Sequence, residues 1–171
     1  MAAPPCSVNN GEMEHTLVLV RHAHAEPYAD GGDHARPLSS RGHEQARLLG
    51  QRLAQILPTC DVAVYSDARR TQETAEHLLR ACPAEVAWAD RSLYTAYPKD
   101  ILTLISQIND ARTLVIIGHE PTISEVGSLL AIDSHAISRG VPTATALVLR
   151  HNAEWSTLHD QQCELEVLYQ G

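Results

Sequence analysis

Residues 16–22 have the sequence TLVLVRH, the stretch that indicates the fold most clearly. Its first five residues form a continuous apolar run, typical of a strand that is buried on both faces of a parallel sheet. The run ends directly in Arg21 and His22, side chains that can bind an oxyanion and attack an electrophile. The stretch therefore predicts an α/β fold with reactive groups at the end of its first strand.

Similar runs recur along the chain and alternate with helical patterns. We expect further strands at residues 61–65, 86–88, 113–117, 145–149 and 164–169. Apolar residues at three- and four-residue spacing indicate helices between them, with Ser40 and Ser66 as candidate N-cap residues. This alternation predicts a three-layer αβα sandwich with a mainly parallel central sheet.

Length and composition limit the kind of protein. The chain has 171 residues, of which 44% are apolar, so it can bury a substantial core in one compact domain. We assign residues 15–171 to that domain and residues 1–14 to a flexible tail. The tail has neither the basic start nor the apolar run of a signal peptide.

The charge of the chain argues against several partners. A formal net charge of −8 disfavours nucleic acid and anionic membranes, because both bind basic surfaces. No stretch approaches the ~18 apolar residues of a membrane span. The widely spaced cysteines favour free thiols in a reducing cytoplasm over a disulfide framework or a metal motif; they are Cys6, Cys60, Cys82 and Cys163.

Three predicted strands end in groups suited to anion binding. The first ends in Arg21 and His22, the second is followed by Arg69 and Arg70, and the third is followed by His119. Parallel strands bring their carboxyl ends to one edge of the sheet, where ligands of open α/β folds bind. Alone, each group is more often a solvated loop residue or a structural histidine. Together they predict a phosphate pocket.

Four segments in order also resemble one family. VRHA at residues 20–23 resembles the Arg-His-Gly signature of the histidine phosphatase superfamily, which includes the phosphoglycerate mutases. RPLSSRGHEQA at 36–46, SDARRTQETA at 66–75 and GHEPTIS at 118–124 are similar to its other motifs. The resemblance covers about Leu17 to Leu149. The short length and the Gly-His-Glu-Pro form look closest to the SixA-type phosphohistidine phosphatases.

The resemblance assigns roles to particular residues. It implies that His22 is the nucleophile, that its other ring nitrogen donates to a backbone carbonyl, and that Arg21, Arg70 and His119 hold the phosphoryl oxygens. The family arginine lies four residues after the motif serine, which selects Arg70 over Arg69. The chain departs from the motifs in three places, which are Ala23, Asp67 and Glu73.

The resemblance further implies a metal-independent phosphatase without a cofactor. Its pocket would bind phosphate and other tetrahedral oxyanions, and its substrate would be a phosphohistidine-bearing signalling protein. Phosphoesterases of the superfamily usually carry an acid where this chain has Tyr94, Thr95 and Ala96 after Leu93. We expect neither Asp90 nor Glu120 to replace it, so phosphoramidates should be preferred over alkyl phosphoesters.

Other functions remain open from the sequence. A small-molecule phosphomonoesterase of the same superfamily would use the same residues. His22, His24 and His34 could instead form a metal site, since imidazole binds zinc, copper and nickel. The pocket could also bind phosphate without turning it over.

Overall fold

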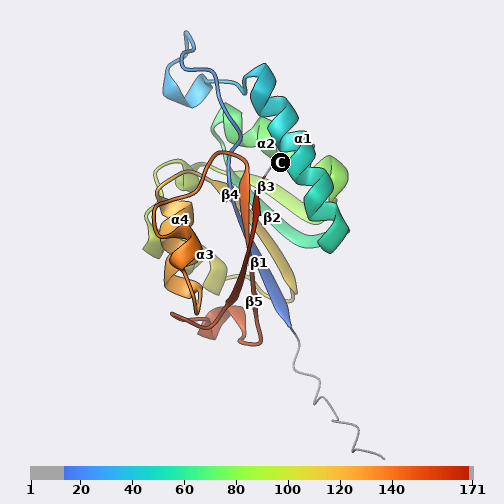
Figure 1. Cartoon of the computed structure of the whole chain (residues 1–171), viewed down its shortest axis with the longest axis vertical. Coiled ribbons are helices and arrows are strands. Elements are labelled where there is room, and N and C mark those ends of the chain that lie inside the picture. The colour runs from blue at the N-terminus through green and yellow to red at the C-terminus, as the bar shows by residue number, and fades with distance from the viewer. Residues whose placement is uncertain (1–13, 170–171) are drawn as a thin grey trace, which may run out of the picture.

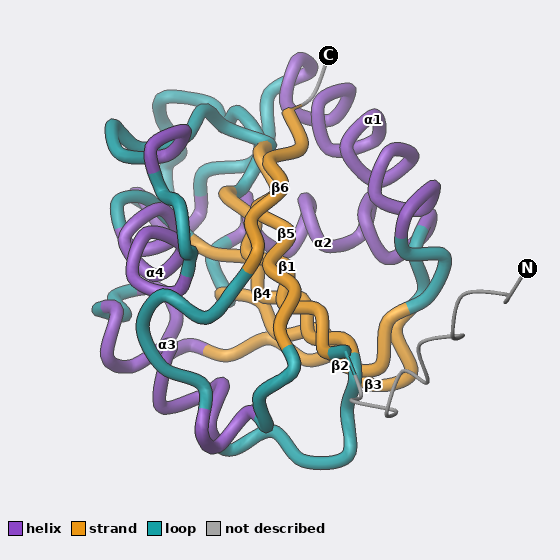
Figure 2. Tube along the Cα trace, turned by 60° about the horizontal axis from the view of Figure 1, so that its bottom comes forward, coloured by secondary structure: helices purple, strands orange, loops and turns teal. Residues whose placement is uncertain are grey.

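The computed structural model describes residues 14–169, which form one six-stranded sheet with helices on both faces (Figure 1, Figure 2). The strands are β1 (His15–Arg21), β2 (Cys60–Ser66), β3 (Ala84–Asp90), β4 (Thr113–Gly118), β5 (Thr145–His151) and β6 (Glu164–Tyr169). The helices are α1 (Ser40–Ile56), α2 (Arg69–Ala81), α3 (Pro98–Ser106) and α4 (Thr122–Leu130). Short 3₁₀ turns connect them, namely η1 (Asp33–Ala35), η2 (Arg91–Tyr94), η3 (His135–Ile137) and η4 (Trp155–Thr157).

The sheet is mixed but mainly parallel, as the sequence predicts. Its order is β3-β2-β4-β1-β5-β6. Strands β3, β2, β4 and β1 are parallel to one another, whereas β5 is antiparallel to both β1 and β6. The carboxyl ends of β1, β2 and β4 therefore lie along one edge of the sheet.

Strand β1 lies between β4 and β5 and is buried on both faces. Val18 and Val20 belong to the core under α1 and α2, whereas Leu17 and Leu19 belong to the core under α3 and α4. Helices α1 and α2 lie on one side of the sheet and α3 and α4 on the other (Figure 1), which gives the three predicted layers. Each such buried side chain stabilises the fold by about 1.5–3 kcal/mol through its removal from water.

Two predicted helix caps were wrong. Helix α1 is capped by Ser39, whose Oγ accepts from the Gly42 amide at 3.0 Å, and Ser40 is already helical. Helix α2 begins after Ala68 without a side-chain cap. Ser66 is the last residue of β2, and its Oγ accepts from the Ala68 amide at 3.2 Å, so it supports the turn before the helix instead.

Gly42 lets the start of α1 approach the segment that follows His22. A Cβ atom on Gly42 would collide with the carbonyl oxygen of His24. The Ser39 amide donates to that same carbonyl at 3.0 Å, so the two segments are joined at this point. This close approach explains why the RPLSSRGHEQA segment needs a glycine there.

Within residues 14–169, no helix combines the length and apolar character needed to cross a membrane. Cys60, Cys82 and Cys163 are buried free thiols. Residues 1–13, which hold Cys6 and almost all of the predicted tail, lie outside the described residues.

Candidate active site

The three strand ends that the sequence singles out meet at one pocket. His22 follows β1, Arg70 lies in the first turn of α2 after β2, and His119 follows β4. The rings of His22 and His119 lie edge to face, with centroids 5.3 Å apart. Arg70 Nε is 3.3 Å from His22 Nε2, and Arg70 Nη2 is 3.4 Å from His119 Nδ1.

One nitrogen of His22 is occupied by the backbone. Its Nδ1 is 2.8 Å from the carbonyl oxygen of Ala23, an arrangement in which Nδ1–H donates and Nε2 keeps its lone pair. Burial lowers the pKa of His22 to about 3, an effect that the Ala23 hydrogen bond opposes and the charges of His119, Arg70 and Arg21 reinforce. The ring is therefore neutral near pH 7, and its Nε2 lone pair accepts from Arg70 Nε at 3.3 Å.

The adjacent arginines of α2 have different surroundings. Arg70 is 5% exposed and points its guanidinium at His22 and His119. The Arg69 side chain is 60% exposed and pairs with Glu73 one helical turn later, at 2.8 Å. Consecutive helical residues point about 100° apart, so only one of the two reaches the pocket. That residue is Arg70, the one that the motif spacing selects.

His119 is oriented by β2. Its Nε2 is 2.9 Å from Ser66 Oγ, and Arg70 contacts its Nδ1. Since Arg70 can only donate, Nδ1 is the acceptor and Nε2–H donates to Ser66. Burial, followed by the charge of Arg70, lowers the pKa of His119 to about 4. An oxyanion beside it would favour the protonated ring.

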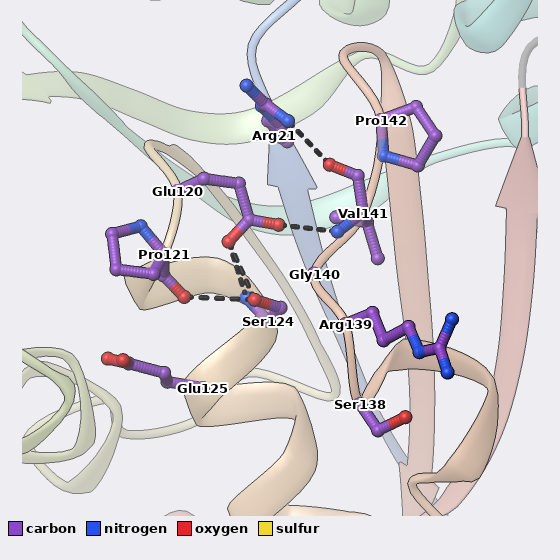
Figure 3. A pocket seen from close by; sticks show the side chains of 10 residues that line it. All are labelled: Arg21, Glu120, Pro121, Ser124, Glu125, Ser138, Arg139, Gly140, Val141 and Pro142. Atoms are coloured by element: carbon purple, nitrogen blue, oxygen red, sulfur yellow. Dashed lines mark hydrogen bonds between the residues drawn. The ribbon is translucent and has the colours of Figure 1, made fainter.

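Arg21 is held by the loop that leads into β5 (Figure 3). Its Nη1 donates to the Val141 carbonyl at 2.6 Å, and the Val141 amide donates to Glu120 Oε1 at 2.8 Å. Glu120 Oε2 accepts from Ser124 Oγ at 2.7 Å. Within the described residues, the buried Arg21 Nε has no hydrogen-bond partner, so this donor is available to an oxyanion.

A cavity of about 600 Å³ adjoins the pocket on the Arg21 side. Arg21, Glu120 and Glu125 line it on one side and Arg139 on the other (Figure 3). Its lining does not include His22 or Arg70, so it is a space next to the reactive groups and not the site of attack.

The sequence did not identify Asp33 and Tyr94, which complete the pocket. Asp33 in η1 pairs with Arg70 through Oδ2 at 3.1 Å, and its backbone carbonyl accepts from Arg70 Nη1 at 2.8 Å. Tyr94 donates its hydroxyl to Asp33 Oδ2 at 2.6 Å. This bond, with help from Arg36 and Arg70, holds the pKa of Asp33 well below its usual range. The sequence does contain one indication of Asp33, since this residue lies three positions before Arg36, where the second motif begins.

Two departures from the family motifs have their own partners. Asp67 Oδ1 is 2.8 Å from His34 Nε2 and joins the turn before α2 to η1. Glu73 Oε2 accepts from the Leu38 amide at 2.6 Å. Both acidic residues thus fasten the segment between β1 and α1 to α2, which carries Arg70.

The histidines of the suggested metal cluster have separate partners. His22 contacts Ala23, His24 Nδ1 lies 2.7 Å from Ser39 Oγ, and His34 contacts Asp67. In the part of the chain that the structure describes, no group of three or more His, Cys, Asp or Glu side chains is arranged to hold a metal ion.

Comparisons with known proteins agree with this geometry. The model of the histidine phosphatase superfamily (branch 1) matches residues 17–91. An uncharacterised Mycobacterium tuberculosis protein is 37% identical over 146 residues, which cover 80% of this chain and 90% of that protein. A SixA structure from Nakamurella multipartitia has a TM-score of 0.80 at 30% identity, and the aligned residues cover 92% of this chain and 96% of that chain. The protein histidine phosphatase SixA complexed with tungstate shares the fold, with a TM-score of 0.71 at 16% identity over 90% of this chain and 96% of that one.

The strand-end cluster and these matches define the class of protein. The chain belongs to the histidine phosphatase superfamily. Among solved structures, it is similar to SixA proteins over nearly its whole described length. Membership supports phosphatase activity.

Proposed function

We propose that this protein is a phosphohistidine phosphatase that works through a phosphorylated His22. The observation that carries the proposal is the state of His22: Nδ1 is tied to Ala23, and Nε2 lies 3.3 Å from the Arg70 guanidinium. A neutral imidazole nitrogen beside a fixed cation is suited to attack phosphorus in line.

In the proposed reaction, Arg21, Arg70 and His119 hold the three non-bridging oxygens. The two arginines offset the charge that spreads over these oxygens in the transition state, a task for which their planar forks are suited. To bind these oxygens, each arginine must give up one of its present hydrogen bonds or use an N–H group that has no partner among the described residues. The buried Nε of Arg21 is such a group. Water then hydrolyses the phosphorylated His22, and these steps need no metal ion.

Phosphohistidine is proposed as the substrate because, among the residues that the structure describes, the two candidate carboxylic acids are both engaged as hydrogen-bond acceptors. Asp90 accepts from both the amide and the hydroxyl of Ser92, and Glu120 is engaged by Val141 and Ser124. Phosphohistidine needs less help, since imidazole has a reference pKa near ~6.5 and a protonated ring leaves as a neutral one.

We further propose a cytoplasmic signalling protein as the source of the phosphohistidine. Buried free thiols at Cys60, Cys82 and Cys163 suit a reducing compartment. The SixA protein described in complex with tungstate is called a protein histidine phosphatase, and the present chain has the same fold. That likeness supports a protein substrate here.

The test compares kcat/KM for a phosphohistidine peptide, an aryl phosphate and a sugar phosphate. We expect the peptide to be best, the aryl phosphate to be intermediate and the sugar phosphate to be worst. General acid catalysis typically contributes ~10²–10⁴-fold, so a gap of that order is expected between the first and the last. A sugar phosphate that is turned over as well as the peptide would contradict the proposal and favour a phosphomonoesterase.

A further inference from the structure

The carboxylate of Asp33 is held at the mouth of the pocket by groups from different elements. Oδ1 accepts from Arg36 Nε at 2.9 Å, whereas Oδ2 accepts from the Tyr94 hydroxyl at 2.6 Å and from Arg70 Nη2 at 3.1 Å. The Asp33 side chain is 53% exposed although it makes these contacts. It therefore contacts the buried Arg70 guanidinium and is also accessible from solvent.

Arg70 lies between this carboxylate and the nucleophile. Its Nε is directed at His22 Nε2, and its Nη2 is directed at Asp33 Oδ2. A phosphoryl group bound to this edge of the guanidinium would have His22 at one end and Asp33 at the other. In-line displacement places the leaving group opposite the nucleophile. Asp33 contacts the guanidinium nitrogen Nη2, whereas His22 contacts Nε, so the carboxylate is a candidate to meet that leaving group.

We propose that Asp33 determines the specificity of this site for phosphohistidine, by accepting a hydrogen bond from the protonated imidazole of the leaving group. The proposal rests on the proposed function and names the residue that recognises the departing ring. A carboxylate paired with an imidazolium ion is a charge-assisted contact, which is stronger than a neutral one.

The step balances without a proton transfer. His22 Nε2 forms a bond to phosphorus, and the bond from phosphorus to the substrate ring nitrogen breaks with its electron pair on that nitrogen. The proton on the other ring nitrogen stays there, hydrogen-bonded to Asp33, and the ring leaves neutral. When the phosphoryl group takes the Arg70 donors, Asp33 loses one contact and is still held by Arg36 and Tyr94.

The same carboxylate disfavours phosphoesters. Tyr94, Arg36 and Arg70 keep the pKa of Asp33 well below its usual range, so it has no proton for an alkoxide. The other titratable groups around it are His34 and His119, which both pack edge-on against Tyr94. An anionic leaving group would face the Asp33 charge at close range, whereas a cationic ring would be attracted.

The test is Asp33→Asn, which keeps the shape and removes the charge. For a phosphohistidine peptide we expect kcat to fall roughly 10- to 100-fold, as for the loss of a hydrogen bond to a charged group. For p-nitrophenyl phosphate we expect no fall, because its leaving group is an anion. Asp30→Asn is the matched control, since Asp30 is an exposed carboxylate three residues away in the same segment.

A pH profile separates recognition from a structural role. Ionised Asp33 raises the pKa of the bound substrate ring, so the alkaline fall in kcat should lie at higher pH in the wild type than in Asp33→Asn. A tenfold stabilisation of the protonated substrate ring by Asp33 corresponds to a displacement of the profile by about one pH unit. Equal losses on both substrates without this displacement would overturn the proposal, because they would mean that Asp33 only positions Arg70.

Two further results keep the test decisive. If Asp33→Asn does not fold, Tyr94→Phe removes the hydroxyl that orients the carboxylate and should show the same selective loss at smaller size. An unchanged substrate preference in Tyr94→Phe would then overturn the role of Asp33. A wild-type protein that does not hydrolyse phosphohistidine defeats the proposed function itself, whereas a preference that survives in Asp33→Asn defeats only the present inference.

Discussion

Strand β1 has a histidine pair at each end, and the two pairs differ in a way that defines the site. His22 and His119 meet beyond its carboxyl end, with ring centroids 5.3 Å apart. His15, its first residue, stacks on His151 of β5 at 5.5 Å, and both rings are buried against Trp155. Residue type and ring separation therefore do not distinguish a candidate catalytic pair from a structural one.

Electrostatics of single residues does not distinguish them either. Burial lowers the pKa of His151 to about 4, and it does the same to His119. The difference lies in the neighbours: the first pair contacts the Arg70 guanidinium, whereas the second pair packs against the indole of Trp155. Within residues 14–169, His151 Nε2 and His15 Nδ1 have no hydrogen-bond partner. Converging cations, not a perturbed pKa, distinguish the candidate catalytic pair from the structural one.

The largest expected effect comes from His22→Ala, which should lower turnover by roughly 10⁴-fold or more, as for the loss of a nucleophile. His15→Ala should leave turnover close to that of the wild type and reduce the free energy of unfolding by roughly 1–3 kcal/mol. Labelling with a phosphoryl donor should give an acid-labile, alkali-stable adduct on the wild-type protein and no adduct on His22→Ala. Undiminished turnover by His22→Ala would end the nucleophile assignment.

The second comparison is between neighbouring arginines. Arg70→Ala removes a guanidinium beside both pocket histidines and should cost on the order of 10²–10³-fold in kcat, as for other preorganised donors to a developing charge. Arg69→Ala breaks an exposed pair with Glu73 and should change kcat little. The reverse result, measured on any turned-over phosphoryl donor, would mean that Arg69 and not Arg70 binds the phosphoryl group.

Acid should reveal the structural pair through stability. The pKa of His151 is lowered from 6.5 to about 4 in the folded chain, so the unfolded chain binds more protons between these values. The stability that depends on this residue is therefore complete above pH 6.5 and is lost as the pH falls towards 4. Chemical denaturation of His151→Gln across this range should show a flatter dependence, whereas exposed His135→Gln should follow the wild type.

The smallest effect concerns ligand binding at the first pair. Vanadate, tungstate or phosphate should inhibit competitively, and chelators should leave activity unchanged. A bound dianion favours the protonated form of a nearby imidazole, so the pKa of His119 should rise while that of His151 stays constant. An NMR titration of the ring protons with tungstate measures both. Activity lost to a chelator and restored by a divalent ion would support the metal alternative instead.

The sequence predicts the parts of the site that follow regular elements. The apolar run of β1 predicts where His22 lies, and the motif spacing distinguishes Arg70 from Arg69. Asp33 could not be placed in this way, because residues 24–38 carry no helical or strand period. Its partners are distant in sequence, with Arg70 37 residues away and Tyr94 61 residues away. In the sequence, Tyr94 only occupies a place where an acid is expected, because its role as a donor to Asp33 depends on tertiary packing.

The support of Arg21 has a consequence for redesign. Arg21 Nη1 donates to the main-chain carbonyl of Val141, and the main-chain amide of Val141 in turn donates to Glu120. Ser138, Arg139 and Pro142 are exposed on the same loop and line the adjoining cavity. Their side chains can therefore be exchanged while the backbone clamp on Arg21 stays in place. Substitutions in this loop should therefore alter substrate preference while the phosphate pocket stays unchanged.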